Sequence, residues 1–297
     1  MNLVRYGSTR SVPRTTERHR TTALDEARWY RKLGDVVAAI GEPGFAPTLV
    51  EALGQIASFD HSVIFAYRGS DRPLCLYDTF NKAQRHIYVT LYQEGPYLLD
   101  PFYHACRDRV APGLYRMRQL APDRFYQSEY FRSYYVKTRL AEEIAFFFPL
   151  RGEIMVALSL MRADTGPVFS GRAMARLSAI EPVVRSICRR HWQDVVEARA
   201  ADSRDGPTPP AFDTVMARVF QQLGPSSLTR RECEVVSLVL QGHSSESIGR
   251  LLGITPGTAK IHRKNIYRKL GISSQAEMFS LFLAILPQDA QSVLARR

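Results

Sequence analysis

The stretch that decides the C-terminal fold, residues 228–272, reads LTRRECEVVSLVLQGHSSESIGRLLGITPGTAKIHRKNIYRKLGI. Its first part predicts a helix that begins after Thr229, a good N-cap residue with Glu232 three positions later. Gly242 ends this helix, as a C-cap glycine does. An apolar stripe at helical spacing gives the helix a buried face: Val235, Val236, Val239 and Leu240.

Two further helices follow, separated by Gly253. Ser244 or Ser245 can cap a short second helix, whose apolar face is Ile248, Leu251 and Leu252. Thr255 caps the third helix, and Pro256 occupies the first-turn position, where its missing N–H costs nothing. The third helix turns Ala259, Ile266 and Leu270 inward and places most of its cations on the other side.

A short helix, a tight glycine-bearing turn and a second, cationic helix make up a helix-turn-helix. The stretch resembles the LuxR-type (FixJ or GerE type) DNA-binding domain, whose pattern is approximately LTxREREVLxLVAxGxSNKEIAxxLxISxxTVKxHxxNIxxKLxV. Matching residues run through the whole stretch: Leu228, Thr229, Arg231, Glu232, Glu234, Val235, Gly242, Ser244, Ile248, Leu251, Ile254, Thr258, Lys260, His262, Asn265, Ile266, Lys269 and Leu270. A solvated cationic bundle is the alternative, but the complete motif favours DNA binding.

The departures from the family pattern are small. Ser245-Glu246-Ser247 replaces Asn-Lys-Glu, and Gly249 replaces an alanine. Because Glu246 stands where the family has lysine, one phosphate contact of the supporting helix is lost.

The resemblance implies which side chains meet double-stranded DNA. Four are expected to face bases or their surroundings: Thr258, Lys260, Ile261 and Lys264. Three are expected to hold phosphates: Arg263, Arg268 and Lys269. In the family the final helix, here 275–285, pairs two copies, so a homodimer is expected, and RNA polymerase is a further candidate partner.

Composition agrees with a nucleic-acid partner. The chain has 297 residues, a net charge of +11 and a pI near 9.7. Such an excess of cations favours polyanions. The four cysteines form no paired motif, which argues against a disulfide framework or a zinc site. The first residues lack the apolar core of a secretory signal and no run could span a bilayer, so we expect a cytoplasmic protein.

The sequence predicts four segments: a disordered basic tail (1–22), a sensor (23–198), a linker (199–211) and the DNA-binding domain (212–297, motif core 228–285). In the sensor, helices are expected at 24–40, 46–59, 87–93, 102–109, 124–140 and 169–197. Strands are expected at 61–67, 73–78, 143–150 and 153–161. This order predicts an α/β fold, an α-β-α sandwich around one antiparallel sheet, like the GAF and PAS sensor folds.

The sensor half carries no catalytic or phosphate-binding motif, so we expect no enzyme and no cofactor. It also lacks the acidic cluster of a phosphorylated receiver domain. Asp100, His104 and Cys106 are close in sequence, but a lone group of this kind is weak evidence for a metal site, and a core or surface role is favoured.

A second, weaker resemblance concerns the autoinducer-binding domains of LuxR proteins, which carry a Trp, a Tyr, an Asp-Pro pair and a second Trp in order. Tyr88, Tyr92, Asp100 (before Pro101) and Tyr115 take these places. The resemblance implies a small quorum-sensing signal such as an acyl-homoserine lactone, with Asp100 accepting from the acyl-amide N–H. Both family tryptophans are tyrosine here, which puts that particular ligand in doubt.

Two alternatives remain open for this half. The four residues can be a ligand pocket, in which a few polar groups converge in an apolar cleft. They can instead be core aromatics with Asp100 as a helix N-cap, in which case the half is a ligand-free dimerisation or protein-interaction module. An empty cavity at these side chains would favour the first, and solid packing the second.

Overall fold

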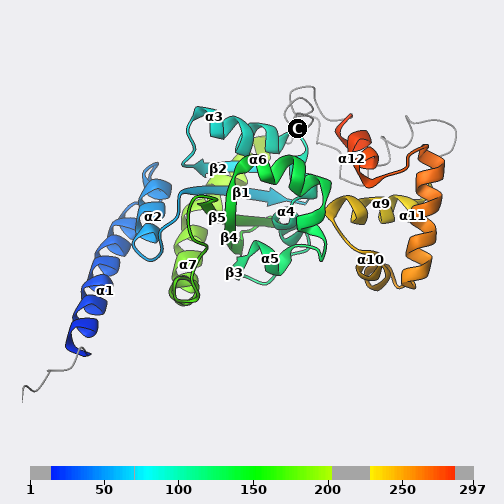
Figure 1. Ribbon diagram of the computed structural model, residues 1–297. Helices are drawn as coiled ribbons and strands as arrows, with labels where there is room; N and C mark the ends of the chain where they lie inside the picture. Colours follow the sequence, from blue (N-terminus) through cyan, green and yellow to red (C-terminus); the bar gives the residue numbers. More distant parts are fainter. Residues whose placement is uncertain (1–14, 70, 203–227, 285–297) are drawn as a thin grey trace, which may run out of the picture. The chain divides into compact units, whose positions relative to one another are not determined.

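The computed structural model describes residues 15–69, 71–202 and 228–284, and it divides into two compact units, one up to Ser58 and one from Phe59 onward. Figure 1 shows the helices and strands of both units.

The first unit consists of helices α1 (Thr15–Ala38) and α2 (Phe45–Gly54), which pack together and share an ion pair of 2.6 Å between Lys32 Nζ and Glu51 Oε1. The expectation of a disordered tail up to residue 22 is wrong from Thr15 onward, because α1 begins there; residues 1–14 lie outside the described part. Once an amphipathic helix has formed, each added residue gains a backbone hydrogen bond at little further cost, so polar sequence can extend it.

The second unit is built on a five-stranded antiparallel sheet in the order β2-β1-β5-β4-β3. Its strands are β1 (His61–Arg68), β2 (Leu74–Asp78), β3 (Gly113–Arg116), β4 (Leu140–Pro149) and β5 (Ile154–Ala163). Four of them were expected from the alternation of the sequence. The short edge strand β3 was not, because it follows a Pro-Gly break and pairs only with β4.

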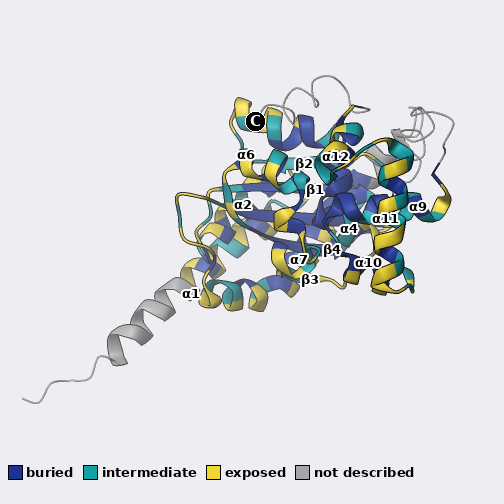
Figure 2. Ribbon diagram, turned by 45° about the vertical axis from the view of Figure 1, so that its right-hand side comes forward, coloured by how far each residue is buried: buried dark blue, intermediate teal, exposed yellow. Residues whose placement is uncertain are grey.

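The register of the central strands divides their side chains between two faces. On one face, helix α4 (Pro101–Arg107) packs on β1 and β5. The side chains of the sheet that belong to the hydrophobic core on this face are Val63, Phe65, Tyr67, Ala145, Phe147, Ala157 and Met161. The alternate row of β4 and β5 is also buried, and helix α7 (Gly171–Asp202) packs on β3 and β4. Both faces are therefore covered, as in an α-β-α sandwich, and the buried sheet is seen in Figure 2.

The segments around α4 are short and irregular. They are α3 (Lys82–Arg85), the π-helix η1 (His86–Leu91), the 3-10 helix η2 (Pro96–Leu99), α5 (Met117–Leu120), the 3-10 helix η3 (Phe125–Gln127), the π-helix η4 (Phe131–Tyr135) and α6 (Val136–Thr138). The expectation of one helix over 124–140 is therefore wrong. Phe125, Tyr130 and Tyr134 are each buried, and burying all of them breaks the regular helical period.

Helix α7 (Gly171–Asp202) continues through Pro182, so the expected division of this segment is wrong, while the alternative of a kink stays a prediction. The Ser186 hydroxyl donates to the Pro182 carbonyl at 2.9 Å. Because α7 reaches Asp202, the expectation that a linker begins at residue 199 is wrong; the rest of that linker lies outside the described residues.

The C-terminal helices are α9 (Arg230–Gln241), α10 (Ser245–Leu252), α11 (Pro256–Leu270) and α12 (Gln275–Leu283). The expected caps are confirmed: Thr229 with Glu232, Ser244 and Thr255 each accept from a backbone N–H of the first turn. Gly242 and Gly253 are left-handed, as the C-caps require.

Within the described ranges, no helix has the length and apolar character needed to cross a membrane. All four cysteines fall in these ranges, and no disulfide joins any two of them.

Candidate DNA-binding surface and sensor cavity

Helix α11 presents the expected base-reading side to solvent (Figure 2). The Ile261 side chain is 61% exposed, although it is apolar, and Lys260 and Lys264 are exposed beside it. Thr258 is half-buried, with its hydroxyl 2.9 Å from that of Thr255. An exposed apolar residue between lysines suits contact with base edges in a major groove.

A groove of about 440 Å³ runs along this side of α11. Expected DNA residues Lys260, Arg263 and Lys264 line it, together with Ser245, Glu246, Tyr267 and Arg124. Tyr267 and Arg124 were not foreseen. Tyr267 lies one turn from Arg263 on the same helix, so helical spacing could have indicated it, whereas Arg124 is distant in sequence.

Two of the expected phosphate contacts are engaged within the protein. Arg268 is exposed and donates to Asn265 Oδ1 at 3.4 Å, which is a weak contact. Lys269 Nζ lies 2.7 Å from Glu232 Oε2, and the Glu232 side chain is only 6% exposed. Burial alone would raise the pKa of Glu232, but hydrogen bonds from Lys269 and Thr229 outweigh it and lower that pKa. The structure therefore gives Lys269 a role in the fold of α9 and α11.

Replacing Lys269 with alanine is expected to lower the free energy of unfolding by about 1.5–3 kcal/mol, because the buried Glu232 carboxylate loses a charged donor. The matched control is Lys260→Ala, whose exposed side chain should leave stability within about 0.5 kcal/mol. Urea unfolding followed by circular dichroism measures both. Equal stability of the two variants would show that the Lys269–Glu232 pair contributes nothing to the fold.

The turn between α9 and α10 lies against a loop of the sheet domain. Arg124 N–H donates to the Gly242 carbonyl at 2.9 Å, and Ser244 N–H donates to Asp123 Oδ1 at 2.9 Å. Gly242 has φ +99°, and a Cβ there would lie 2.8 Å from the Phe125 Cα. Only glycine therefore permits both the turn and this close approach.

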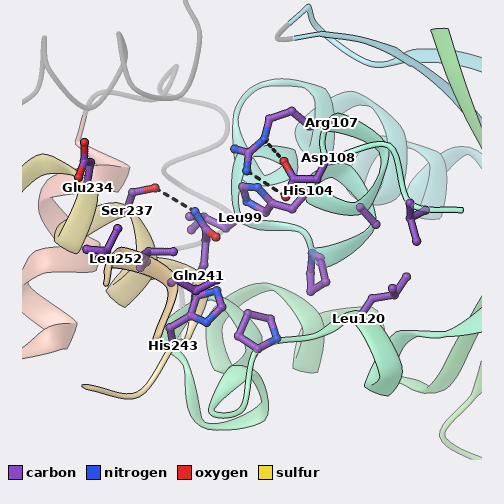
Figure 3. A pocket seen from close by; sticks show the side chains of 16 residues that line it. Leu99, His104, Arg107, Asp108, Leu120, Glu234, Ser237, Gln241, His243 and Leu252 are labelled. Atoms are coloured by element: carbon purple, nitrogen blue, oxygen red, sulfur yellow. Dashed lines mark hydrogen bonds and ion pairs between the residues drawn. The ribbon is translucent and has the colours of Figure 1, made fainter. Parts of the chain in front are cut away.

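Beside this contact lies a hollow of about 630 Å³, lined by His104 and Arg107 of α4, by its C-cap Asp108, and by Ser237 and Gln241 of α9 (Figure 3). Its polar groups are already used locally: Gln241 donates to Ser237 at 2.9 Å, and Arg107 pairs with Asp108 at 2.8 Å. The hollow therefore offers few unoccupied polar groups to a ligand.

A second, smaller cavity lies inside the sheet domain and has a volume of about 30 Å³. Three of the four expected ligand residues line it: Tyr88, Tyr92 and Asp100. The fourth expectation, Tyr115, is not met. Tyr115 lies on edge strand β3, donates to the Ala111 carbonyl at 3.0 Å and packs edge-on against Phe147.

Asp100 is held firmly at this cavity. It caps α4 by accepting from Phe102 N–H at 2.8 Å, and its other oxygen accepts from the Tyr92 hydroxyl at 2.8 Å. The Tyr92 hydroxyl also lies 3.0 Å from that of Tyr67. Burial raises the pKa of Asp100 to about 6, against the opposing effect of these two hydrogen bonds. Asp100 thus caps α4 and lines the cavity at the same time.

The cavity also contains a second carboxyl group that sequence analysis missed, Glu143 on β4. Tyr135 donates to its Oε2, and burial followed by the proximity of Asp100 raises the pKa of Glu143 to about 7. The signal was present in the sequence: Glu143 shares the period-two row of Ala145 and Phe147, so a carboxyl group faces the core.

Tyr88 donates its hydroxyl to the Thr138 carbonyl and stacks on Phe80, with ring centroids 4.4 Å apart. The other polar wall residues were not foreseen either: Tyr67, Tyr134, Tyr135, Thr138 and Ser159. The Asp100–His104–Cys106 group does not assemble a metal site: His104 Nε2 contacts the Leu98 carbonyl at 2.8 Å. Across the described ranges, no three His, Cys, Asp or Glu side chains are arranged to hold a metal ion.

Comparison with known proteins gives the family. Residues 226–282 match the model of the bacterial regulatory proteins, luxR family. A putative HTH-type transcriptional regulator in the exeN 3' region of Aeromonas salmonicida is 35% identical over 184 residues, which is 62% of this chain and 93% of that protein. The transcriptional activator protein PhzR of Pseudomonas fluorescens is 35% identical over 138 residues, 46% of this chain and 47% of PhzR.

Two solved structures are similar at a lower level. The VqsR LBD domain of Pseudomonas aeruginosa has a TM-score of 0.48 and 26% identity and covers 55% of this chain and 95% of its own. Escherichia coli SdiA has a TM-score of 0.39 and 15% identity, and the match covers 87% of this chain and 96% of the SdiA chain.

The relatives are transcription regulators and not enzymes. The helix-turn-helix geometry, the matched family model and the relative aligned over nearly its whole length agree, and the chain belongs to the luxR family of bacterial transcription regulators.

Proposed function

We propose that this regulator binds a small signal molecule in the cavity of its sheet domain and, as a homodimer, binds DNA with α11 in the major groove. The observation that carries the proposal is the convergence of Tyr88, Tyr92 and Asp100 on one buried cavity. The dimer places two recognition helices on half-sites one helical turn apart, and RNA polymerase is the partner through which it acts on transcription.

The DNA half of the proposal rests on the exposed side of α11. Lys264→Ala is expected to weaken specific DNA binding by about 1–3 kcal/mol if Lys264 contacts a base edge. The measurement is a titration of the variant against a selected operator and against unrelated DNA at fixed salt. A loss confined to the operator supports base reading, whereas equal weakening on both sequences assigns Lys264 to phosphate contact only.

The signal half can be tested on the full chain by thermal shift with N-acyl-homoserine lactones of varied acyl length. A ligand that binds only the folded state stabilises it by about 2.7 kcal/mol at a hundred times its dissociation constant. A concentration-dependent rise in Tm that is lost in Asp100→Asn would support the cavity as the ligand site.

The second candidate function, a ligand-free interaction or dimerisation module, is favoured by the size of the cavity. Ligand pockets commonly have volumes of about 300–1,000 Å³, whereas this one has about 30 Å³. If no lactone raises Tm and the stability of the dimer is the same with and without lactone, the ligand-free module is favoured.

A further inference from the structure

The groove along α11 contains one cation that does not come from the helix-turn-helix. Arg124 lines this groove, together with Ser245 and Glu246 of α10 and three cations of α11. It belongs to the sheet domain, in the turn between α5 and η3. A side chain of the sensor half therefore reaches the surface that the proposed function assigns to DNA.

Hydrogen bonds fix the backbone of Arg124 against the turn between α9 and α10. Arg124 N–H donates to the Gly242 carbonyl at 2.9 Å, and Asp123 Oδ1 accepts from Ser244 N–H at 2.9 Å. Ser244 is the N-cap of α10, and the N-terminus of a helix favours an anion such as the Asp123 carboxylate. Asp123 therefore anchors the loop, and the neighbouring Arg124 is placed beside the first turn of α10.

The other side of the same loop is anchored in the sheet domain. Phe125 is completely buried, and its ring packs edge-on against those of Phe131 and Tyr135, with centroids 5.6 and 5.7 Å apart. Tyr135 is also a wall residue of the small cavity. The packing of the sensor half therefore sets the position of Arg124 on the groove.

The guanidinium of Arg124 is available to a phosphate. The residue is exposed, and among the described residues its side chain has no hydrogen bond and no ion pair. Its nearest charged neighbour on the groove is indicated by Glu246. The pKa of this exposed carboxyl is lowered, first by its own backbone N–H and, among charged groups, by Lys260 and Arg124.

Glu246 explains why an added cation matters at this place. The first helix of a helix-turn-helix crosses the DNA backbone, and Glu246 puts a negative charge in the first turn of that helix, α10. The family pattern has lysine at this position. Lys260 Nζ lies 3.9 Å from Glu246 Oε1, which makes a loose pair screened by solvent. Arg124 returns a positive charge to this part of the groove.

We propose that Arg124 contacts a phosphate of the DNA backbone, so that the DNA-binding surface is shared between the helix-turn-helix and the sheet domain. This inference rests on the proposed function, in which α11 enters the major groove. A guanidinium presents its N–H donors in a planar fork that matches phosphate oxygens. Because a phosphate contact carries no base information, Arg124 adds affinity equally on every DNA sequence.

A phosphate contact has a signature in the salt dependence of binding. The logarithm of the binding constant falls with the logarithm of the salt concentration, with a slope of about −0.9 for each phosphate neutralised. Loss of the Arg124 contact should therefore make the slope shallower by about 1. Between about 50 and 200 mM salt, this one contact changes the affinity by about three- to fourfold. A residue that only supports the fold would not change the slope.

The experiment titrates the full chain against two duplexes of equal length, an operator selected with the wild type and an unrelated sequence, at several salt concentrations. Arg124→Gln removes the guanidinium but keeps the backbone N–H that donates to Gly242. We expect it to bind both duplexes at least about threefold more weakly at about 50 mM salt, with a slope shallower by about 1. Arg124→Lys keeps the charge and should keep the slope.

The matched control is Arg118→Gln. Arg118 is an exposed arginine on α5 of the same domain and is not among the described residues that line the groove. Its replacement removes the same charge from the chain, so it separates a contact with DNA from a change in net charge. Urea unfolding of every variant gives the fraction of folded protein, for which the affinities are corrected.

Each of the other outcomes decides against the proposal. A slope in Arg124→Gln equal to that of the wild type or of Arg118→Gln would overturn the contact. Tighter binding by Arg124→Gln would show that the loop obstructs the DNA surface, and a loss confined to the operator would assign Arg124 to base reading. If the wild type binds no duplex at all, the DNA half of the proposed function fails together with this inference.

Discussion

Replacing Glu143 with glutamine is expected to stabilise the sheet domain at pH 8 and to leave it almost unchanged at pH 5. In the folded protein the pKa values of Asp100 and Glu143 are raised from 3.8 and 4.5 to about 6 and about 7. An acid whose folded pKa is raised contributes stability that is fully present below its unfolded value and is lost as pH rises through the folded value. Stability of the wild type should therefore decline between about pH 4 and pH 7.

The size of this effect follows from the shifts. One pKa unit corresponds to about 1.4 kcal/mol, so the Glu143 carboxyl accounts for a few kcal/mol between pH 5 and pH 8. Glutamine has no charge to bury and can still accept from Tyr135, so the variant should lose this part of the pH dependence.

The measurement is urea unfolding at pH 5 and pH 8, followed by the fluorescence of Trp192, which is buried on α7. The only other tryptophan, Trp29, is replaced with phenylalanine in every protein compared. Asp164→Asn serves as the exposed control. Wild-type protein that gains stability from pH 5 to pH 8 by this probe would contradict the prediction.

Replacing Gly242 with alanine is expected to cost about 2–5 kcal/mol, through two separate effects. Left-handed backbone costs a non-glycine residue about 1–2 kcal/mol, and Gly242 has φ +99°. The added Cβ would also lie 2.8 Å from Phe125 Cα and 3.0 Å from Phe125 N. Because these are backbone atoms, the loop must move, and overpacking of this kind costs about 1–3 kcal/mol more.

Gly253→Ala is the matched control, since Gly253 also ends a helix with φ +65° but has no atom within 4 Å of the place that a Cβ would take. It should show the backbone strain alone, about 1–2 kcal/mol. Thermal or urea unfolding of both variants isolates the contact with the sheet-domain loop. Equal losses would show that Phe125 does not lie against the α9–α10 turn in solution.

The helix-turn-helix could be predicted in detail because its signals are local. Thr229, Ser244 and Thr255 each cap the helix that follows them, and capping depends on only the next few residues. Gly249 departs from the family pattern, and only the structure explains why a glycine stands there. A Cβ at this position would lie 2.8 Å from the Ile254 carbonyl oxygen.

The sensor cavity could be predicted only in part. Tyr88, Tyr92 and Asp100 lie close together in sequence and reach the cavity, but Tyr115 depends on where strand β3 pairs, and β3 is an edge strand. Glu143 was overlooked because it begins an apolar run, although its place in the period-two row of Ala145 and Phe147 indicated a core-facing carboxyl group. Lys269 matched the family pattern and lies on the cationic helix, yet its ion pair with Glu232 spans two helices and cannot be read from spacing.

The two π-helices bear on how so small a cavity can admit a ligand. Tyr88 comes from η1, and Tyr134 and Tyr135 come from η4, so these turns form part of its wall. A π turn contains one residue more than an α turn, and such turns are frequent at functional sites. Passing that residue along the helix rotates a side chain by about 100°, while the backbone remains hydrogen-bonded. The wall thus contains spare chain length, and we expect the tyrosines of η1 and η4 to move more readily than the residues on the strands.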